Sequence, residues 1–144
     1  MSGYDWVPCY NFNIPHNAVK CGTDLDGSEI YVGLSHYNGD ELPCKIVPRR
    51  RVAYISHNGK EITVSEFKIL CEKALRWLPS SNGGVPKGAI PAGRTINGET
   101  LYIGRTSLRN VTVVGKVHPS HGCLYVPYDG KEVAYKQYEV LVFH

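Results

Sequence analysis

The feature that most constrains this chain is an internal repeat. When the 144-residue sequence is shifted by 71 positions, residues 6–70 align with residues 77–141 without a gap. Sixteen of the 65 aligned pairs are identical, whereas unrelated chains of average composition would match at roughly 4 positions. The identical pairs are Trp6/Trp77, Pro8/Pro79, Asn11/Asn82, Pro15/Pro86, Ala18/Ala89, Gly22/Gly93, Gly27/Gly98, Tyr31/Tyr102, Gly33/Gly104, Lys45/Lys116, Pro48/Pro119, Tyr54/Tyr125, Gly59/Gly130, Lys60/Lys131, Glu61/Glu132 and Leu70/Leu141. The sequence therefore predicts two copies of one structural unit.

Short strands joined by tight turns are the expected content of each copy. The chain has 15 Gly, 9 Pro and 10 Tyr, which favours many turns between half-buried strands. Asn58-Gly59 and Asp129-Gly130 are strong signals for two-residue hairpins. Gly33 and Gly104 fall in the middle of predicted strands, where glycine marks a bulge or a close backbone approach.

One segment gives conflicting signals. Residues 64–78 have apolar residues at helical spacing. The equivalent segment of the second copy, Tyr138-Glu-Val-Leu141, alternates β-branched and aromatic residues in the manner of a strand. We therefore expect a strand over residues 66–70 and allow a helical turn over 72–76.

The size of the repeats indicates that they pack into one compact unit. Each copy has about 65 residues, which is marginal for independent stability, and the connection between the copies is short. We expect a single domain over residues 1–144, made of the tandem repeats 6–70 and 77–141. The predicted architecture is all-β, compact and pseudo-twofold symmetric, with an exchange of strands between the repeats left open. Strand edges exposed by such an arrangement favour a homodimer.

Composition argues against several classes of protein. A formal net charge of +3 is too mild to suggest a nucleic-acid partner, and no apolar run is long enough to predict insertion into a membrane. The start of the sequence does not resemble a signal peptide, and five cysteines without a Cys-x-x-Cys motif suggest reduced, buried thiols. These features predict a cytoplasmic location, with release by a non-classical route as the other option.

The sequence offers no argument for catalysis. Gly-x-Ser-x-Gly, phosphate-binding loops and His-Glu-x-x-His are all absent. His118-Pro-Ser-His121 is the single histidine cluster, and a polar loop is favoured over a metal site because further ligands are missing. Arg49-Arg50-Arg51 is interpreted as a solvated loop rather than a phosphate-binding patch. We expect no enzyme activity, no catalytic residue, no cofactor and no bound metal.

A set of charged residues in the first copy is the most informative polar feature. It consists of Asp24, Asp40 or Glu41, and Lys45. Lys45 recurs as Lys116, which suggests a structural part for the lysine, whereas the aspartates occur in the first copy alone. An ammonium beside a carboxylate matches vicinal sugar hydroxyls, which both donate and accept hydrogen bonds. The other interpretation is a surface ion pair worth under about 1 kcal/mol.

Taken together, the motifs resemble the DM-nine repeat family, which includes natterin-like proteins. The residues that carry the resemblance are Trp6, Ile14-Pro15-x-x-Ala18-Val19, Gly22-x-Asp24-x-Asp26-Gly27, Ile30-Tyr31-Val32-Gly33, Gly39-Asp40-x-x-Pro43-x-Lys45, Gly59-Lys60-Glu61 and their partners in the second copy, which end in Tyr138-Glu139-Val140-Leu141. The resemblance covers nearly the whole chain and implies two repeats of this family.

The resemblance also implies a function. The family includes an all-β, homodimeric lectin that binds high-mannose glycans without a metal, through an Asp and a Lys. These match Asp24 and Lys45, with Asp40 as a further carboxylate and Glu41 as a weaker neighbour. The implied function is a mannose-binding lectin of the pattern-recognition, innate-immunity type. Thr95 and Val111 stand where the second copy would need carboxylates, so Lys116 is the candidate for a second site with an incomplete set of partners.

Two other functions stay open at this point. The first is an intracellular interaction or scaffold protein that keeps the fold without binding sugar, which the free cysteines and the absence of a leader favour. The second is membrane perturbation like that of larger natterin-type toxins, which need an additional pore-forming domain.

Overall fold

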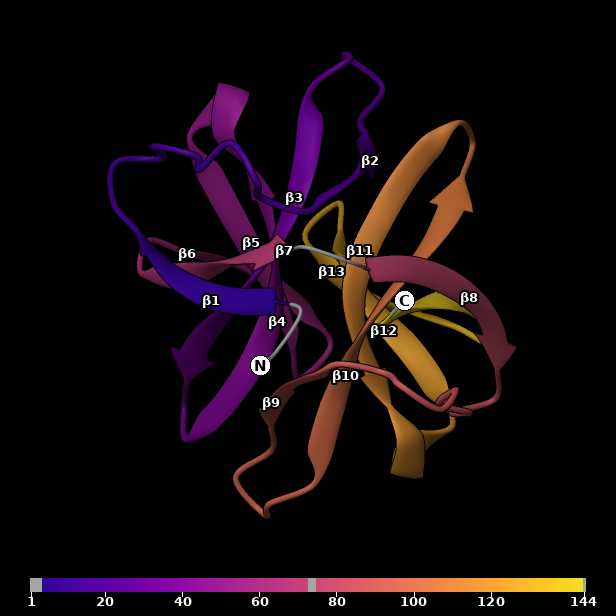
Figure 1. The fold of residues 1–144 in the computed structure, drawn as a ribbon. Coiled ribbons are helices and arrows are strands. Elements are labelled where there is room, and N and C mark those ends of the chain that lie inside the picture. The colour runs from indigo at the N-terminus through magenta and orange to yellow at the C-terminus, as the bar shows by residue number, and fades with distance from the viewer. Residues whose placement is uncertain (1–3, 73–74, 144) are drawn as a thin grey trace.

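The computed structural model describes residues 4–72 and 75–143, which form fourteen strands and two short 3₁₀ helices (Figure 1). The elements of the first repeat are β1 (Tyr4–Cys9), β2 (Lys20–Thr23), β3 (Glu29–Tyr37), β4 (Asp40–Val47), η1 (Pro48–Arg50), β5 (Val52–His57), β6 (Lys60–Val64) and β7 (Phe67–Glu72). Those of the second are β8 (Leu75–Ser81), β9 (Pro91–Arg94), β10 (Thr100–Leu108), β11 (Val111–His118), η2 (Pro119–His121), β12 (Cys123–Tyr128), β13 (Lys131–Tyr135) and β14 (Gln137–Phe143). The prediction of an all-β fold is confirmed.

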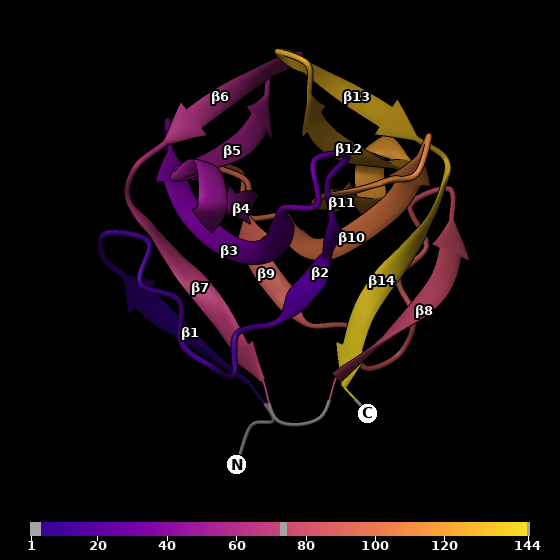
Figure 2. The ribbon, with the colours of Figure 1, turned by 90° about the horizontal axis from the view of Figure 1, so that it is seen from above.

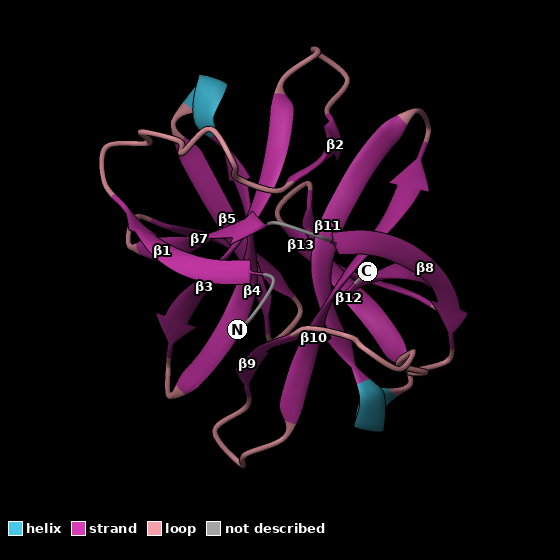
Figure 3. Cartoon of the chain, in the orientation of Figure 1, coloured by secondary structure: helices cyan, strands magenta, loops and turns pink. Residues whose placement is uncertain are grey.

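The symmetry of the molecule reproduces the symmetry of the sequence. Adding 71 to the bounds of β3, β4, β5 and β6 gives those of β10, β11, β12 and β13. The two 3₁₀ helices lie at opposite corners of the molecule, as a twofold axis requires (Figure 3). The repeats are thus related by a pseudo-twofold axis and pack as one compact unit.

All strands belong to one continuous, curled sheet. Its order is β1-β7-β3-β4-β5-β6-β13-β12-β11-β10-β14-β8, with β2 on β3 and β9 bridging β10 and β4. Seen from above, β6 and β13 meet at the junction of the halves, and β1 and β8 lie on opposite outer sides (Figure 2). Strands pair with their own repeat except at β6–β13 and at β9–β4, where Glu41 pairs with Arg94. Exchange of strands is therefore limited to these two junctions.

The shared Gly-Lys-Glu tripeptides form the β6–β13 junction. The N–H of Gly59 donates to Glu132 Oε1 at 2.9 Å, and the N–H of Gly130 donates to Glu61 Oε1 at 2.8 Å. The N–H groups of Glu61 and Glu132 donate in turn to the carbonyls of Gly130 and Gly59 at 3.1 and 3.0 Å. Each carboxylate thus satisfies backbone donors of the other repeat, which explains why both copies carry the motif.

Two equivalent glycines allow the repeats to approach closely. A Cβ on Gly93, whose φ is +88°, would collide with the backbone oxygen of Glu41. A Cβ on Gly22 would collide with the side chain of Thr112, the equivalent of Glu41. Glycine at these positions therefore lets β2 and β9 pack against strands of the opposite repeat.

A shared core joins the two halves. It contains Val19, Cys21, Ile30, Val32, Leu34, Val47 and Leu70 from the first repeat and Ile90, Ala92, Ile103, Val114 and Leu141 from the second. A further cluster lies mainly beneath the strands of the first repeat, with Leu101 added from the second, and another lies beneath the strands of the second. Burial of apolar area against the other repeat offsets the small size of each half.

The local predictions had mixed outcomes. Asn58 and Gly59 have φ values of 54° and 80°, and Asp129 and Gly130 values of 53° and 77°, which confirms the two-residue hairpins. The strand predicted over 66–70 is present as β7. The helical turn allowed over 72–76 is wrong for residue 72 and for residues 75–76, which are strand; residues 73–74 lie outside the described residues. Strand pairing at both ends of the connection overrides its helical apolar spacing.

Candidate functional site

The two equivalent lysines each form a hydrogen bond with the opposite repeat. Lys45 lies in β4 and its Nζ donates to the carbonyl of Pro127 at 3.3 Å; Lys116 lies in β11 and donates to the carbonyl of Ser56 at 2.9 Å. Pro127 and Ser56 are themselves equivalent positions of β12 and β5. Each ammonium therefore bonds the opposite repeat, which gives the shared lysine a structural part.

Lys45 is a partly desolvated cation. Its residue is 5% exposed, and its Nζ lies 5.2 Å from the ring centroid of Tyr54. Burial lowers the pKa of Lys45, and the charges of Glu61 and Asp24 act in the opposite direction. An ammonium with few water neighbours forms stronger hydrogen bonds than an exposed one.

Asp24 lies beside this lysine in the β2–β3 turn. Its Oδ1 accepts from the N–H of Leu25 at 3.0 Å, and its Oδ2 accepts from Arg50 at 2.7 Å. Arg50 also bonds Asp26 Oδ2 at 3.0 Å, and the aspartates raise its pKa. Hydrogen bonds from Ser28, together with Arg50, lower the pKa of Asp26 to about 2. The turn thus holds an Asp-Arg-Asp cluster that is close enough for the charges of Asp24 and Arg50 to act on the ammonium of Lys45.

Arg50 was missed by the sequence argument. Arg49-Arg50-Arg51 was interpreted as a solvated loop, and three different roles emerge. Arg49 donates to the carbonyl of Asp26 at 3.3 Å, Arg50 pairs with both aspartates, and Arg51 donates to the carbonyl of Asn11 at 3.3 Å. Asp24 and Asp26 lie between Gly22 and Gly27, whereas Arg50 lies in η1, after β4. The contact between Arg50 and the aspartates therefore cannot be seen in the sequence.

Asp40 and Glu41 do not join Asp24 and Lys45. Asp40 begins β4, five residues from Lys45, which is roughly 17 Å along a strand and on the opposite face. Its Oδ1 accepts from the N–H of Ile96 at 2.6 Å, and its Oδ2 lies 3.1 Å from His57 Nε2. The grouping of these residues in one cluster, which the resemblance implied, is replaced by a division between two.

The second cluster surrounds Lys116, and Asp40 of the first repeat is linked to it through the neighbouring residues Ser56 and His57. Lys116 Nζ lies 3.1 Å from Glu132 Oε2, and both side chains are nearly buried. Its carbonyl partner, Ser56, precedes His57, the partner of Asp40. Asp40 meanwhile bonds the turn that contains Thr95 and Ile96. Where the second repeat has Thr95 in place of Asp24, a carboxylate from the opposite repeat thus lies beside the turn.

A network of polar side chains beside the second cluster was also unexpected. Glu99 accepts from Ser120 N–H at 2.8 Å and from Ser120 Oγ at 2.6 Å, and lies 2.9 Å from His118 Nε2. The His118 and His121 rings stack at 3.6 Å, and His121 Nδ1 lies 2.9 Å from the hydroxyl of Tyr125. Burial lowers the pKa of His118. Hydrogen-bonded partners occupy these histidines, in keeping with a polar loop.

Within residues 4–72 and 75–143, no group of three or more His, Cys, Asp and Glu side chains is arranged to hold a metal ion. All five cysteines are buried and free.

The fold, with one polar cluster around Lys45 and one around Lys116, defines a protein of two tandem β repeats. Comparison with known proteins gives its family. The model of the DM9 repeat matches residues 1–42 and residues 24–135. The chain therefore belongs to the DM9 repeat family.

Two relatives come from Thalassophryne nattereri. Natterin-3 is 36% identical over 92 residues, which are 61% of this chain and 23% of that protein. Natterin-4 is 30% identical over 149 aligned positions, which cover 97% of this chain and 34% of that protein. The chain thus spans about a third or less of the length of either relative.

A solved structure supports the fold. The nematode sperm cell motility protein MFP2B superposes with a TM-score of 0.61 at 13% identity, over 100% of this chain and 47% of that chain. At this identity the likeness concerns the fold alone.

Among the residues that the structure describes, none forms a helix with the length and apolar character of a membrane span.

Proposed function

We propose that this chain is a carbohydrate-binding protein of the lectin type, with mannose or mannose-containing glycans as its ligands. The observation that carries the proposal is the cluster of Asp24, Arg50 and Lys45 at the junction of the repeats. It presents anionic acceptors beside cationic donors, and vicinal sugar hydroxyls need both. We assign it a binding role rather than catalysis.

The surface at the two turns supports this proposal. Leu25 and Ile96 occupy equivalent positions of the β2–β3 and β9–β10 turns, and each is 70% exposed. An exposed apolar side chain next to hydrogen-bonding groups complements the C–H face and the hydroxyl edge of a pyranose. We therefore propose Asp24 and Lys45 as the first site, and Lys116 with Asp40 beside it as the second; Glu41 lies in a separate groove, described below.

A specific observation favours the other candidate, a protein-interaction scaffold without sugar binding. Both lysine side chains are nearly buried and already bond a carbonyl of the opposite repeat. In this candidate function the clusters are structural, and a sugar would have to replace existing contacts.

Calorimetry with methyl α-mannoside and with a high-mannose oligosaccharide decides between these functions. Asp24→Asn removes the charge beside Lys45, and Asp26→Asn is the matched control because it also removes one Arg50 partner. We expect Asp24→Asn to lower the affinity at least tenfold and Asp26→Asn to change it little. Wild-type protein that binds no glycan and co-purifies with another protein would establish the scaffold function instead.

Homodimerisation is a further part of the proposal. In the part of the chain that the structure describes, β1 and β8 end the sheet order, and they pair with β7 and β14 respectively. Their outer edges carry backbone groups that a second copy could pair with. Native mass measurement tests this, and a monomer at micromolar concentration would contradict it.

A further inference from the structure

The first repeat has an open groove where the second repeat is closed by its own side chains. In the second repeat, Arg105 Nε bonds Glu139 Oε1 at 2.9 Å, and its guanidinium donates to the carbonyl of Cys21 at 2.6 Å. The guanidinium also covers the ring of Trp77 at 4.2 Å. This single side chain therefore fills the space between the sheet and the tryptophan.

The equivalent residues of the first repeat leave that space free. Leu34 stands in place of Arg105, and Lys68 stands in place of Glu139. A hollow of about 310 Å³ lies over Trp6, the equivalent of Trp77, and is bordered by Leu34, Lys68 and Arg94. Where the second repeat has the Arg105–Glu139 ion pair, the first repeat therefore has a cavity with Lys68 and Arg94 at its border.

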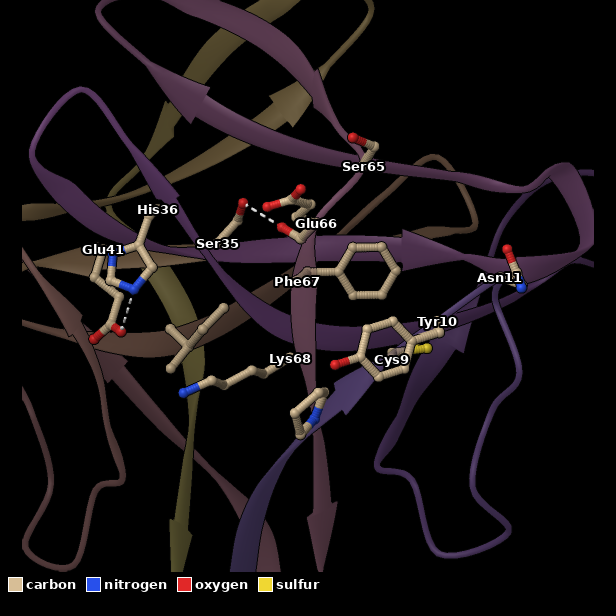
Figure 4. Close-up of a pocket in the computed structure, with 12 residues that line it drawn as sticks. Cys9, Tyr10, Asn11, Ser35, His36, Glu41, Ser65, Glu66, Phe67 and Lys68 are labelled. Atoms are coloured by element: carbon tan, nitrogen blue, oxygen red, sulfur yellow. Dashed lines mark hydrogen bonds and ion pairs between the residues drawn. The ribbon is translucent and has the colours of Figure 1, made fainter.

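This hollow adjoins a larger one of about 690 Å³, because both are lined by Leu34, Glu41 and Lys68. Figure 4 shows Lys68 extending into the groove on the side of His36 and Glu41, with the rings of Tyr10 and Phe67 on the other side. We call the two hollows together the β7 groove, since Phe67 and Lys68 of β7 form its floor. The groove has a charged end and an aromatic end.

The charges at the charged end are unbalanced. The side chains of Lys68 and Arg94 make no hydrogen bond or ion pair with any residue that the structure describes. Glu41, in contrast, already lies 3.4 Å from His36 Nε2. Two cations without an acidic partner among the described residues, both lining the smaller hollow, favour an anionic group in the ligand.

The aromatic end favours a sugar ring as the remainder of that ligand. Tyr10 is 74% exposed, far more than is usual for a large aromatic side chain, and offers a face for stacking. Ser35 Oγ donates to the carbonyl of Glu66 at 2.8 Å, so its lone pairs are left to accept. A hydroxylated ring can use both features, with its face against Tyr10 and a hydroxyl donating to Ser35.

We infer that the β7 groove binds a carboxylated sugar, with its carboxylate between Lys68 and Arg94 and its ring against Tyr10. The inference concerns a different site from the one proposed around Asp24 and Lys45 and does not depend on it. It also explains the asymmetry of the repeats, because the second repeat supplies its own carboxylate, Glu139, at the place of Lys68.

The test is a calorimetric or NMR titration of the full chain with glucuronic acid and with glucose, which differ at the carboxylate. We expect glucuronic acid to bind at least tenfold more tightly than glucose and to lose affinity at high salt. The double variant Leu34→Arg, Lys68→Glu transplants the Arg105–Glu139 pair into the first repeat. It should fold, because the second repeat uses the same pair, and it should abolish binding of glucuronic acid.

Two further measurements make the result decisive. Lys60→Glu makes the same charge reversal as Lys68→Glu, but at the β6–β13 junction outside the groove, and should keep the affinity. Binding of methyl α-mannoside should be the same in the double variant and the wild type, which separates this groove from the Asp24 site. Equal affinity for glucose, unaltered binding in the double variant, or preference for an acidic peptide such as oligoglutamate would each overturn the inference.

Discussion

The two repeats share a backbone and differ in how they treat charge at equivalent places. In the second repeat, Arg105, Lys116 and His118 each lie beside an acidic residue of the same repeat, namely Glu139, Glu132 and Glu99. The first repeat leaves Lys68 unpaired and gathers Asp24 and Asp26 around Arg50 at the surface. At these equivalent positions the second repeat is closed by its own ion pairs, and the first repeat is open.

The largest effect is expected where the repeats touch most closely. Gly93→Ala would place a Cβ against the backbone oxygen of Glu41 at a positive φ, so the strands must separate. We expect a loss of about 4–5 kcal/mol in the free energy of unfolding, measured with urea. At the equivalent Gly22 the obstacle is the movable side chain of Thr112, and Gly22→Ala should cost about 1–3 kcal/mol.

Gly59→Ala provides the control for that comparison. Its φ is +80° and a Cβ would meet open space, so the cost is the backbone strain of about 1–2 kcal/mol. Equal losses in all three variants would show that backbone conformation, rather than contact between repeats, explains the glycines.

The next largest effect is expected for Lys45 and Lys116, which bond the opposite repeat. Lys116→Met would leave the carboxylate of Glu132 nearly buried without its cation, at a cost of about 3–5 kcal/mol. Lys45→Met would leave the carbonyl of Pro127 without this donor, at a cost of about 1–3 kcal/mol. Chemical denaturation of both variants measures the difference, and a larger loss for Lys45→Met would refute the division into a closed and an open half.

A smaller effect concerns pH. The pKa of His118 is lowered by burial, so the unfolded chain takes up a proton below about pH 6.5 before the folded protein does. Stability is therefore lost as the pH falls from about 6.5 toward the folded pKa, and is fully present above that window. His118→Val copies Val47 of the first repeat and should flatten the dependence of Tm on pH between pH 5 and 7. An unchanged slope would exclude His118 as its source.

The smallest effect is expected at the surface pair Lys20–Glu29, which has no equivalent in the second repeat. Its atoms lie 3.2 Å apart, and about half of each side chain is exposed. Water screens such a pair, so Lys20→Ala should leave Tm unchanged within error. A clear fall in Tm would mean that exposed charges stabilise the first repeat more than its geometry indicates.

Much of the fold could be predicted because the repeat provides two versions of each segment. The residues around Phe67 look helical by spacing, and Tyr138-Glu-Val-Leu141 corrected that interpretation to strand. Asn-Gly and Asp-Gly fixed both hairpins through their positive φ values. The helical turn allowed over 72–76 failed where no equivalent copy existed for comparison.

The candidate site was less predictable. Asp24 and Lys45 lie together, whereas Asp40 lies beside the second repeat's turn and Glu41 lines the β7 groove. Sequence spacing places Asp40 five residues from Lys45, but alternation along a strand sends the two side chains to opposite faces. One partner of Asp40 is the backbone N–H of Ile96, which no sequence pattern identifies.

The sequence by itself determined the repeat, the all-β class, the hairpins and the residues that both copies share, because these follow from local conformational preferences and from periodicity. Only the tertiary structure decided that the shared Lys and Glu bond across the pseudo-twofold axis, that Arg50 joins Asp24, and that Leu34 opens a groove that Arg105 closes. The physical reason is that all these contacts join residues distant in the chain, so their geometry is set by the folding of each repeat and by the packing of one repeat against the other.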